Sequence, residues 1–197
     1  MTKEKLIDLC RHYFAQVDKT SSYHPVVVEY TLGRVINTIL YDAFRNNISN
    51  LDLYTKRYDD VPVTKSGGRY TSELPVSIVQ FPGVGDGVRG VYAAQNTALM
   101  FYPSTMENAA RMPYMEFTEV STDVAYVVAN TQVEFIGMPS EVTVVSMDLV
   151  RPFEAYADEE EFYVPAGQDE PMFRMAMQYL QGVVPPDLRN DNNGVRR

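Results

Sequence analysis

A glycine-rich segment is the first candidate for chemistry in this chain: Gly83-Val84-Gly85-Asp86-Gly87-Val88-Arg89-Gly90. Closely spaced glycines cradle a phosphate when a strand precedes them and a helix follows, usually with a lysine and a Ser or Thr. Here the β-like Val91-Tyr92 follows instead of a helix. We therefore expect the tip of a loop.

The two histidines are the next candidates, because a general base near neutral pH is most often an imidazole. His12 falls on the polar side of an expected helix, and His24 stands just before the expected start of another. No Cys or Glu stands at ligand spacing from either histidine. We therefore predict structural or solvated histidines.

An acidic cluster near the C-terminal end could hold a divalent cation or supply a pair of carboxylates. It lacks the alternating Asp/Asn ligands and the central glycine of a calcium loop, and consecutive acids in a strand or loop point in different directions. We interpret the cluster as a solvated surface, with a patch that meets a basic partner as the alternative. Its members are Glu154, Asp158, Glu159, Glu160 and Glu161.

Nucleophilic catalysis has little support in the sequence. No Gly-x-Ser-x-Gly motif occurs, and a Ser-His-Asp triad would have to recruit His12 or His24, because the C-terminal half contains no histidine. We predict no catalytic residue, no metal and no cofactor, and that the protein is not an enzyme. A pair of carboxylates remains the open alternative, since such pairs have no sequence signature.

The charge balance bears on the kind of partner. With 17 basic against 26 acidic side chains, the formal net charge is −9. A surface of that sign repels phosphate backbones, so tight nucleic-acid binding is disfavoured. A wall past which DNA slides without sticking remains compatible with this charge.

Length and composition indicate one folded domain. The chain has 197 residues, of which 45% are hydrophobic, and two halves would each be close to the size at which burial becomes marginal. No apolar run reaches the roughly 18 residues that cross a bilayer, and the N-terminus does not resemble a secretory signal. The single cysteine, Cys10, suits a reducing compartment and falls at a core position. We expect a soluble protein that stays where it is made.

Helical periodicity dominates the first 48 residues. Apolar residues share one side from Lys3 to Val17, and Thr2 is expected to cap this helix. Pro25 is well placed in the first turn of a second helix, which should reach about Arg45. The pattern predicts an αα-hairpin.

The following region, 49–167, changes to β-like alternation interrupted by breakers. Strands are expected at Thr97 to Tyr102 and at Glu141 to Val150, and Val124 to Val128 should pair with Gln132 to Ile136 around a turn at Ala129-Asn130-Thr131. Residues Met106 to Met112 should form a short helical turn. The stretch 51–90 has few apolar anchors and is expected to include a long excursion or an extended hairpin. The fold class is therefore α+β, with an antiparallel sheet.

A final helix is expected from Asp169 to Gln181, within the segment 168–182. Pro171 opens it, Gly182 follows it, and Pro185-Pro186 prevents its continuation. Spaced at about 100° per residue, its apolar side chains cover an arc of roughly 200°. Residues 183–197 should form a flexible tail.

This apolar arc has two open interpretations. Either the helix is buried centrally in its own domain, or one flank packs on the core and the other on a neighbouring subunit. Methionine and tyrosine are enriched at interfaces, which favours the second interpretation. We predict interface roles for Met172, Met175 and Tyr179.

The order of elements resembles head–tail neck proteins of short-tailed phages, most closely ring or adaptor proteins of crAss-like phages. The resemblance is most specific in three stretches: Val142-Thr143-Val144-Val145-Ser146-Met147-Asp148-Leu149-Val150-Arg151-Pro152, Glu161-Phe162-Tyr163-Val164-Pro165 and Asp169-Glu170-Pro171-Met172-Phe173. It implies a homo-oligomeric ring, expected to be a dodecamer, stacked beneath the portal protein in a virion made in the cytoplasm of a bacterial host. Adjacent neck or tail proteins would be its other partners, and DNA would pass through the channel without specific binding. Either the tip of the Gly83 to Gly90 segment, with Gly85, Asp86 and Gly87, or the tail after Gly182 would reach an adjacent ring.

Two other classes of protein stay open. A monomeric binding module would use its long β-loops to engage a small molecule or a peptide. A virion-associated hydrolase would require two acidic residues that converge in a pocket with a raised pKa.

Overall fold

The computed structural model describes residues 1–18, 23–45, 49–81, 87–93, 98–105, 107–108, 123–164 and 167–182. It confirms the α+β fold class and the N-terminal helical hairpin. The chain divides into two compact units. The helical unit comprises residues 1–42 and 156–197, and the β unit comprises residues 43–155. A compact unit is not the same as an independently folding domain, so the single domain stays a prediction.

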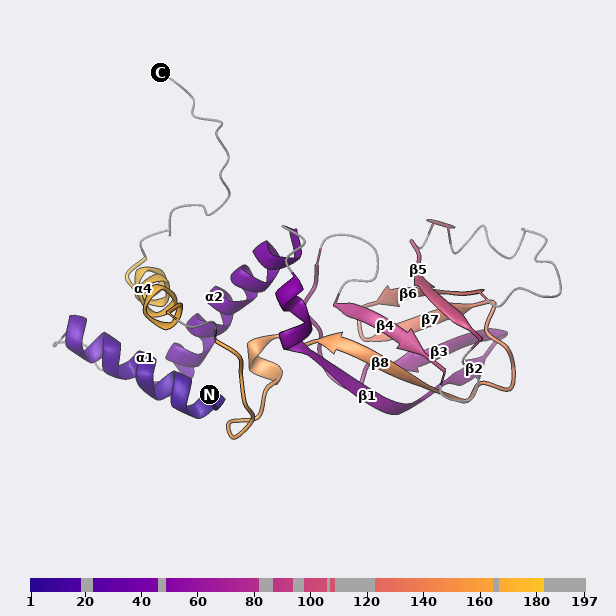
Figure 1. Ribbon diagram of the computed structural model, residues 1–197, viewed down its shortest axis with the longest axis horizontal. Helices are drawn as coiled ribbons and strands as arrows, with labels where there is room; N and C mark the ends of the chain where they lie inside the picture. The colour runs from indigo at the N-terminus through magenta and orange to yellow at the C-terminus, as the bar shows by residue number, and fades with distance from the viewer. Residues whose placement is uncertain are drawn as a thin grey trace, which may run out of the picture. The chain divides into compact units, whose positions relative to one another are not determined.

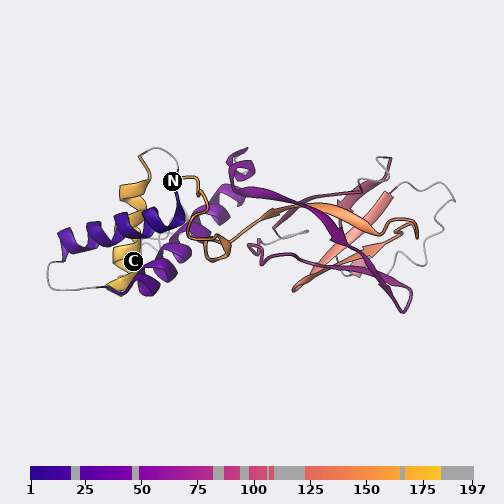
Figure 2. The same ribbon diagram turned by 90° about the horizontal axis from the view of Figure 1, so that it is seen from below.

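Three helices form the described part of the helical unit (Figure 1). They are α1 (Lys3–Val17), α2 (Pro25–Arg45), whose last residues belong to the β unit, and α4 (Asp169–Leu180). Helix α4 crosses α1 (Figure 2), and the rings of Tyr13 and Phe173 meet at 5.9 Å between centroids. The core side chains come from all three helices: Leu6, Cys10, Phe14, Val28, Leu32, Val35, Met172 and Ala176.

Local signals set the helix starts. The Thr2 hydroxyl accepts a hydrogen bond from the Lys5 N–H at 3.3 Å, which satisfies one of the unpaired donors of the first turn of α1. At the start of α2, the carbonyl of His24 accepts from the Val27 and Val28 N–H groups at 2.9 and 3.2 Å. Pro25 follows in the first helical position, where its missing N–H costs nothing. Both helices therefore begin where the sequence predicts.

The N-terminus is fixed to the segment 156–162 by backbone pairing. The Lys3 and Glu4 N–H groups donate to the carbonyls of Glu160 and Asp158, at 3.1 and 3.0 Å. The Lys3 ammonium, only 5% exposed, lies 2.6 Å from the Glu29 carboxylate and donates to the Tyr156 carbonyl at 2.9 Å. Acidic residues near a helix N-terminus are favoured by the helix dipole. Three of the five acidic residues of the cluster, Asp158, Glu160 and Glu161, thus pair through their backbone with the first residues of the chain.

The β unit holds two sheets that share one core (Figure 1). The three-stranded sheet has the order β1-β8-β4 and the five-stranded sheet the order β2-β3-β7-β6-β5. Side chains of both sheets meet, including Val91 and Met147 from the first and Val124 and Phe135 from the second. The strands are β1 (Thr55–Pro62), β2 (Thr64–Ser66), β3 (Arg69–Glu73), β4 (Val88–Tyr92), β5 (Met100–Pro103), β6 (Asp123–Ala129), β7 (Gln132–Ile136) and β8 (Val144–Val150).

The two sheets are linked by a direct passage of the chain from β1 to β2, and the five-stranded sheet contains the β2–β3 and β6–β7 hairpins. Strand β2 follows β1 after a single residue, so the chain passes directly from the first sheet into the second. The β2–β3 turn uses Gly67 and Gly68 at φ of 58° and 84°, as a tight hairpin turn requires. The predicted β6–β7 hairpin is confirmed, with Asn130 at φ 55° in its turn.

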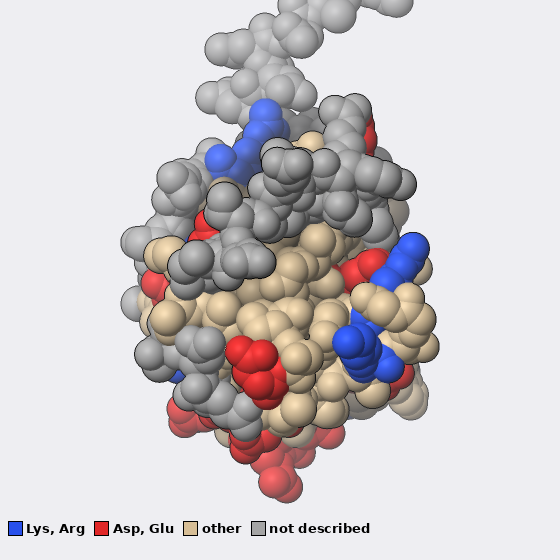
Figure 3. Space-filling view, turned by 90° about the vertical axis from the view of Figure 1, so that its right-hand side faces the viewer, with Lys and Arg blue, Asp and Glu red and all other residues tan. Residues whose placement is uncertain are grey.

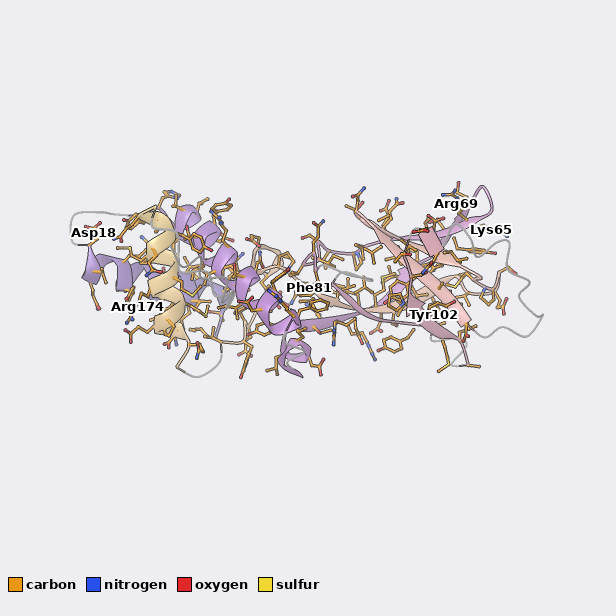
Figure 4. All side chains as sticks on the ribbon, turned by 90° about the horizontal axis from the view of Figure 1, so that it is seen from above. Asp18, Lys65, Arg69, Phe81, Tyr102 and Arg174 are labelled. Atoms are coloured by element: carbon orange, nitrogen blue, oxygen red, sulfur yellow. The ribbon has the colours of Figure 1, made fainter. Side chains whose placement is uncertain are left out.

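The remaining pairings include one correction. Strands β5 and β6 pair in parallel, whereas the sequence led us to expect antiparallel pairing. Two 3₁₀ helices flank the sheets, η1 (Ser49–Tyr54) and η3 (Phe153–Ala155). Phe81 stacks on Phe44 within this unit at 4.4 Å between ring centroids (Figure 4). Of the predicted helical turn, Glu107 and Asn108 are helical, and the rest lies outside the described residues, as does the predicted tail.

Candidate interaction surface

Helix α2 carries apolar side chains on its solvent side as well as on its core side. Its core side is closed, since Val28, Leu32 and Val35 are fully buried. In the first two turns the opposite side bears Val26, Val27 and Tyr30, which are 62%, 43% and 61% exposed. We call these three residues the α2 patch.

The α2 patch is continuous because of helical spacing. Val26 and Tyr30 are four residues apart and Val27 and Tyr30 are three apart, so the Tyr30 side chain neighbours both valines. One turn further on, the Arg34 guanidinium lies 4.8 Å from the ring centroid of Tyr179 on α4. The same side of α2 thus has an intramolecular contact at Arg34 and stays open at its first turns.

Helix α4 does not expose the apolar surface that its composition suggests. Met172 is 3% exposed and lies in the core of the helical unit, so its predicted contact with a neighbour would require that core to open. Met175 and Tyr179 are half-buried, and their interface role stays a prediction. Arg174, which forms an ion pair with Glu170 at 3.0 Å, and Gln181 are exposed, and Gln178 is half-buried.

The predicted glycine loop tip is partly wrong. Gly85 and Asp86 lie outside the described residues, but Gly87 is buried, and its carbonyl accepts the Val150 N–H at 2.8 Å. A Cβ at Gly87 would stand 2.6 Å from the Val79 carbonyl oxygen, which makes it a close-packed backbone position. Gly90 lies within strand β4, so this part of the segment is sheet and not loop.

A three-residue cluster occupies the outer side of the β1-β8-β4 sheet. Arg57 and Asp148 face each other across the strands and form two hydrogen bonds, of 2.8 and 3.0 Å. The Tyr92 ring lies 4.8 Å from the Arg57 guanidinium. Gly90 makes room for this, because a Cβ there would collide with the Tyr92 ring. The three polar groups satisfy one another, as in a structural cross-strand contact.

Electrostatics in this cluster follow from its geometry. Hydrogen bonds from Arg57 hold the pKa of the Asp148 carboxyl below its usual value, although partial burial opposes them and Tyr92 assists. Burial in the β-unit core raises the pKa of Tyr126 to about 12.

Both histidines have local backbone partners. The His12 Nδ1–H donates to the Asp8 carbonyl at 2.7 Å, and His24 Nδ1 accepts the Val26 N–H at 3.3 Å. Within the part of the chain that the structure describes, no three His, Cys, Asp or Glu side chains gather at distances that would hold a metal ion. Likewise, none of the described helices is long and apolar enough to span a bilayer.

A groove of about 340 Å³ lies in the β unit. Its floor is apolar, formed by Leu74, Val76 and Ile78, and its rim consists of Ser77, Gln80 and the β6–β7 turn at 130–131. The Leu74 N–H donates to the Thr131 carbonyl at 2.8 Å and holds the two walls together. The volume is near the lower end of the range of about 300–1,000 Å³ for ligand pockets. None of its lining side chains is charged.

Two basic side chains of the β2–β3 hairpin are engaged with neighbours in their own unit. Lys65 lies over the Tyr70 ring at 5.0 Å, and Arg69 pairs with Glu134 at 3.4 Å, both at the β2–β3 hairpin (Figure 4). On the face drawn in Figure 3, uncharged surface occupies the centre, and Lys and Arg stand beside Asp and Glu at its margins.

A search of protein-family models and of curated proteins returned no match to this chain. The class that the structure itself defines is an α+β protein whose helical unit exposes apolar side chains. Sequence reasoning missed the α2 patch, although the run Val26-Val27-Val28 with Tyr30 surrounds the helix with apolar residues and was a usable signal.

Proposed function

We propose that this protein is a structural component of a phage virion that assembles into a ring in the neck between capsid and tail, around the channel through which DNA leaves. The observation that carries the proposal is the α2 patch. Large apolar side chains gathered on the solvent side of a surface helix are typical of a binding face. Burial of such side chains is worth about 1.5–3 kcal/mol each when complete.

The acidic character of the chain supports the same proposal. A net charge of −9 disfavours adhesion of DNA to a channel wall. Three parts of the proposal come from the resemblance to neck ring proteins alone: the location in the particle, the twelve subunits and the contact with the portal ring.

The test is the mass of the assembled particle. Native mass spectrometry of the purified chain, alone and mixed with a portal ring, is expected to give a closed oligomer. Tyr30→Glu should abolish assembly and leave thermal unfolding of the monomer unchanged, because this side chain is 61% exposed. The matched control is Gln16→Glu, an added charge at an exposed position of α1, which should assemble normally. A monodisperse monomer that does not join the portal ring would contradict the proposal.

The groove in the β unit favours a second candidate, a monomeric module that binds a small molecule or a peptide. Its apolar floor and uncharged rim fit a neutral ligand with apolar side chains. This candidate expects saturable binding of a neutral apolar peptide by a chain that stays monomeric at all concentrations.

A further inference from the structure

Strand β1 is the longest edge strand that the structure describes. Among the described strands, β1 and β4 end the three-stranded sheet, and β2 and β5 end the five-stranded one (Figure 1). Strand β1 has eight residues, against five in β4, three in β2 and four in β5. The N–H and C=O groups along an edge strand can pair with another chain, and a long, regular edge offers the most of them.

A β-bulge interrupts this edge. The register of β1 against β8 shifts between Tyr58 and Val61. Asp59 and Asp60 therefore stand together opposite one residue, Ser146. Both aspartates are exposed. A bulge bends its strand and increases the local twist, which makes the free edge a poor match for another strand.

The apolar core does not require the extra residue. Tyr58 and Val61 both pack on the core of the β unit, although they are three residues apart. In a regular strand, side chains on the same face are two residues apart. With either aspartate removed, Tyr58 and Val61 would have that spacing and would keep their common face. Core packing therefore does not explain the bulge.

The bulge also carries a backbone cost. Asp60 has a φ of 55°, in the left-handed region, where the Cβ of an L-residue crowds the backbone. The other described non-glycine residue with a positive φ is Asn130, which lies in a hairpin turn that requires this geometry. Asp60 lies inside a strand. Backbone strain that packing does not require is typical of positions with a function.

Charge alone would not keep two copies of β1 apart. If two copies met antiparallel around Tyr58, the basic pair 56–57 of each would face the acidic pair 59–60 of the other. Opposite charges across two strands favour pairing. The shape of the bulge is therefore what opposes self-pairing at this edge.

We infer that the bulge at Asp59 and Asp60 blocks the addition of a second copy's β1 to this edge. The three other sheet ends are short or irregular: β2 has three residues, β5 ends at Pro103, and β4 shifts register between Val88 and Gly90. Such a block keeps copies of the chain from joining through their sheets. The inference holds whether or not the chain forms a ring.

Two variants separate the bulge from its backbone strain. Deletion of Asp60 gives β1 a regular pairing with β8, whereas Asp60→Gly keeps the bulge and relieves the strain, because glycine tolerates a positive φ. Each full-length variant is compared with the wild type by hydrogen–deuterium exchange of residues 55–62 at low and at high protein concentration. Circular dichroism with urea unfolding verifies the fold of each variant.

The deletion variant is expected to exchange its β1 amides about tenfold or more slowly at high than at low concentration, because paired amides exchange only when the pairing opens. The wild type and Asp60→Gly should show no such dependence, and Asp60→Gly should have an equal or higher urea midpoint. Deletion of Asp59 is a second bulge-free variant and should behave like deletion of Asp60. The exchange is read in β1 alone, so a ring that forms through another surface leaves it unchanged.

Three results would overturn the inference. One is exchange in β1 that does not depend on concentration in the folded deletion variants, since a regular edge would then still not pair. Another is loss of the folded β unit in both deletion variants, which would mean that the fold itself requires the bulge. The third is the same concentration dependence in Asp60→Gly as in the deletions, which would place the block in the Asp60 side chain.

Discussion

The helical unit and the β unit place their charged and apolar side chains in opposite ways. The helical unit buries the Lys3 ammonium beside the partly exposed Glu29 carboxylate. It exposes five large apolar side chains on α1 and α2: Leu9, Val17, Val26, Val27 and Tyr30. The β unit keeps its Arg57–Asp148 pair on the outside of a sheet and packs both sheets on one apolar core. The difference teaches that, among the described residues, the apolar side chains of α1 and α2 extend from the core of the helical unit to its surface, whereas the two sheets of the β unit enclose a shared apolar core.

The largest test of this comparison concerns α4. Met172→Asp should lower the free energy of unfolding by about 3–5 kcal/mol, because it buries an unpaired charge at a position only 3% exposed. Met175→Asp should cost less, about 1–2 kcal/mol, since this side chain is only half-buried. Urea unfolding followed by circular dichroism measures both.

The control for α4 is Gln181→Asp, an exposed position just after the helix, which should change stability little. If Met172→Asp left the monomer as stable as the wild type and removed assembly alone, α4 would be an interface helix. The assignment of α4 to the core of the helical unit would then be wrong.

The free energy of unfolding should respond differently to the loss of Lys3 and to the loss of Glu29, the two partners of the ion pair in the helical unit. Glu29→Gln leaves the Lys3 ammonium, 5% exposed, without its closest counter-charge, and is expected to cost about 2–3 kcal/mol. Lys3→Met leaves a carboxylate that is 31% exposed and reaches water, and should cost about 1 kcal/mol or less. Equal losses for the two variants would show that water reaches Lys3 as readily as Glu29.

The control for this asymmetry is the surface pair Glu170–Arg174, whose two side chains are each 65% exposed. Glu170→Gln is expected to change stability by a few tenths of a kcal/mol. Thermal and urea unfolding of the three variants at one ionic strength give the comparison.

The helices were predictable because their signals are local. Thr2 and Pro25 mark the starts of α1 and α2, and both helices end where the apolar periodicity ends, at Val17 and Arg45. Helix α4 ends at Leu180, one residue before the predicted Gln181. A helix forms its hydrogen bonds four residues away, so its limits are encoded nearby.

The strands between residues 55 and 92 were harder to predict. Strand β1 pairs with β8, and its Arg57 bonds to a residue 91 positions later, a distance over which no local pattern gives the register. Gly90 resembled a loop glycine, but it lies in strand β4. A glycine is needed there because a Cβ would collide with the Tyr92 ring. The β6–β7 hairpin was found because a two-residue turn fixes its register locally.

The candidate surface could have been found in the sequence but was not. The wide apolar arc of α4 attracted attention, and the structure buries much of it against α1 and α2. Val26, Val27 and Tyr30 were overlooked because the other side of the same helix shows the regular apolar spacing of a core face. Which apolar side of a helix remains exposed depends on how the other elements pack against it. The periodicity of a single helix carries no information about that packing.

The smallest expected effect belongs to the exposed ion pair of the β unit. Because the pKa of Asp148 is lowered in the folded protein, its contribution to stability is fully present above the unfolded pKa of about 3.9 and is lost as the pH falls through the folded value. Asp148→Asn should therefore reduce stability by less than about 1 kcal/mol near pH 7, and the difference from the wild type should vanish near pH 2.

Urea unfolding of both proteins across this pH range measures that difference. Glu134→Gln is the matched control, because its partner Arg69 is 74% exposed and the two groups are 3.4 Å apart, so its effect should be smaller still. A difference between Asp148→Asn and the wild type that stayed constant down to pH 2 would mean that the carboxylate charge is not what stabilises the contact. The contact between Arg57, Tyr92 and Asp148 would then depend on the stacking of Arg57 on Tyr92. The comparison between the ion pairs of the two units would lose its electrostatic basis.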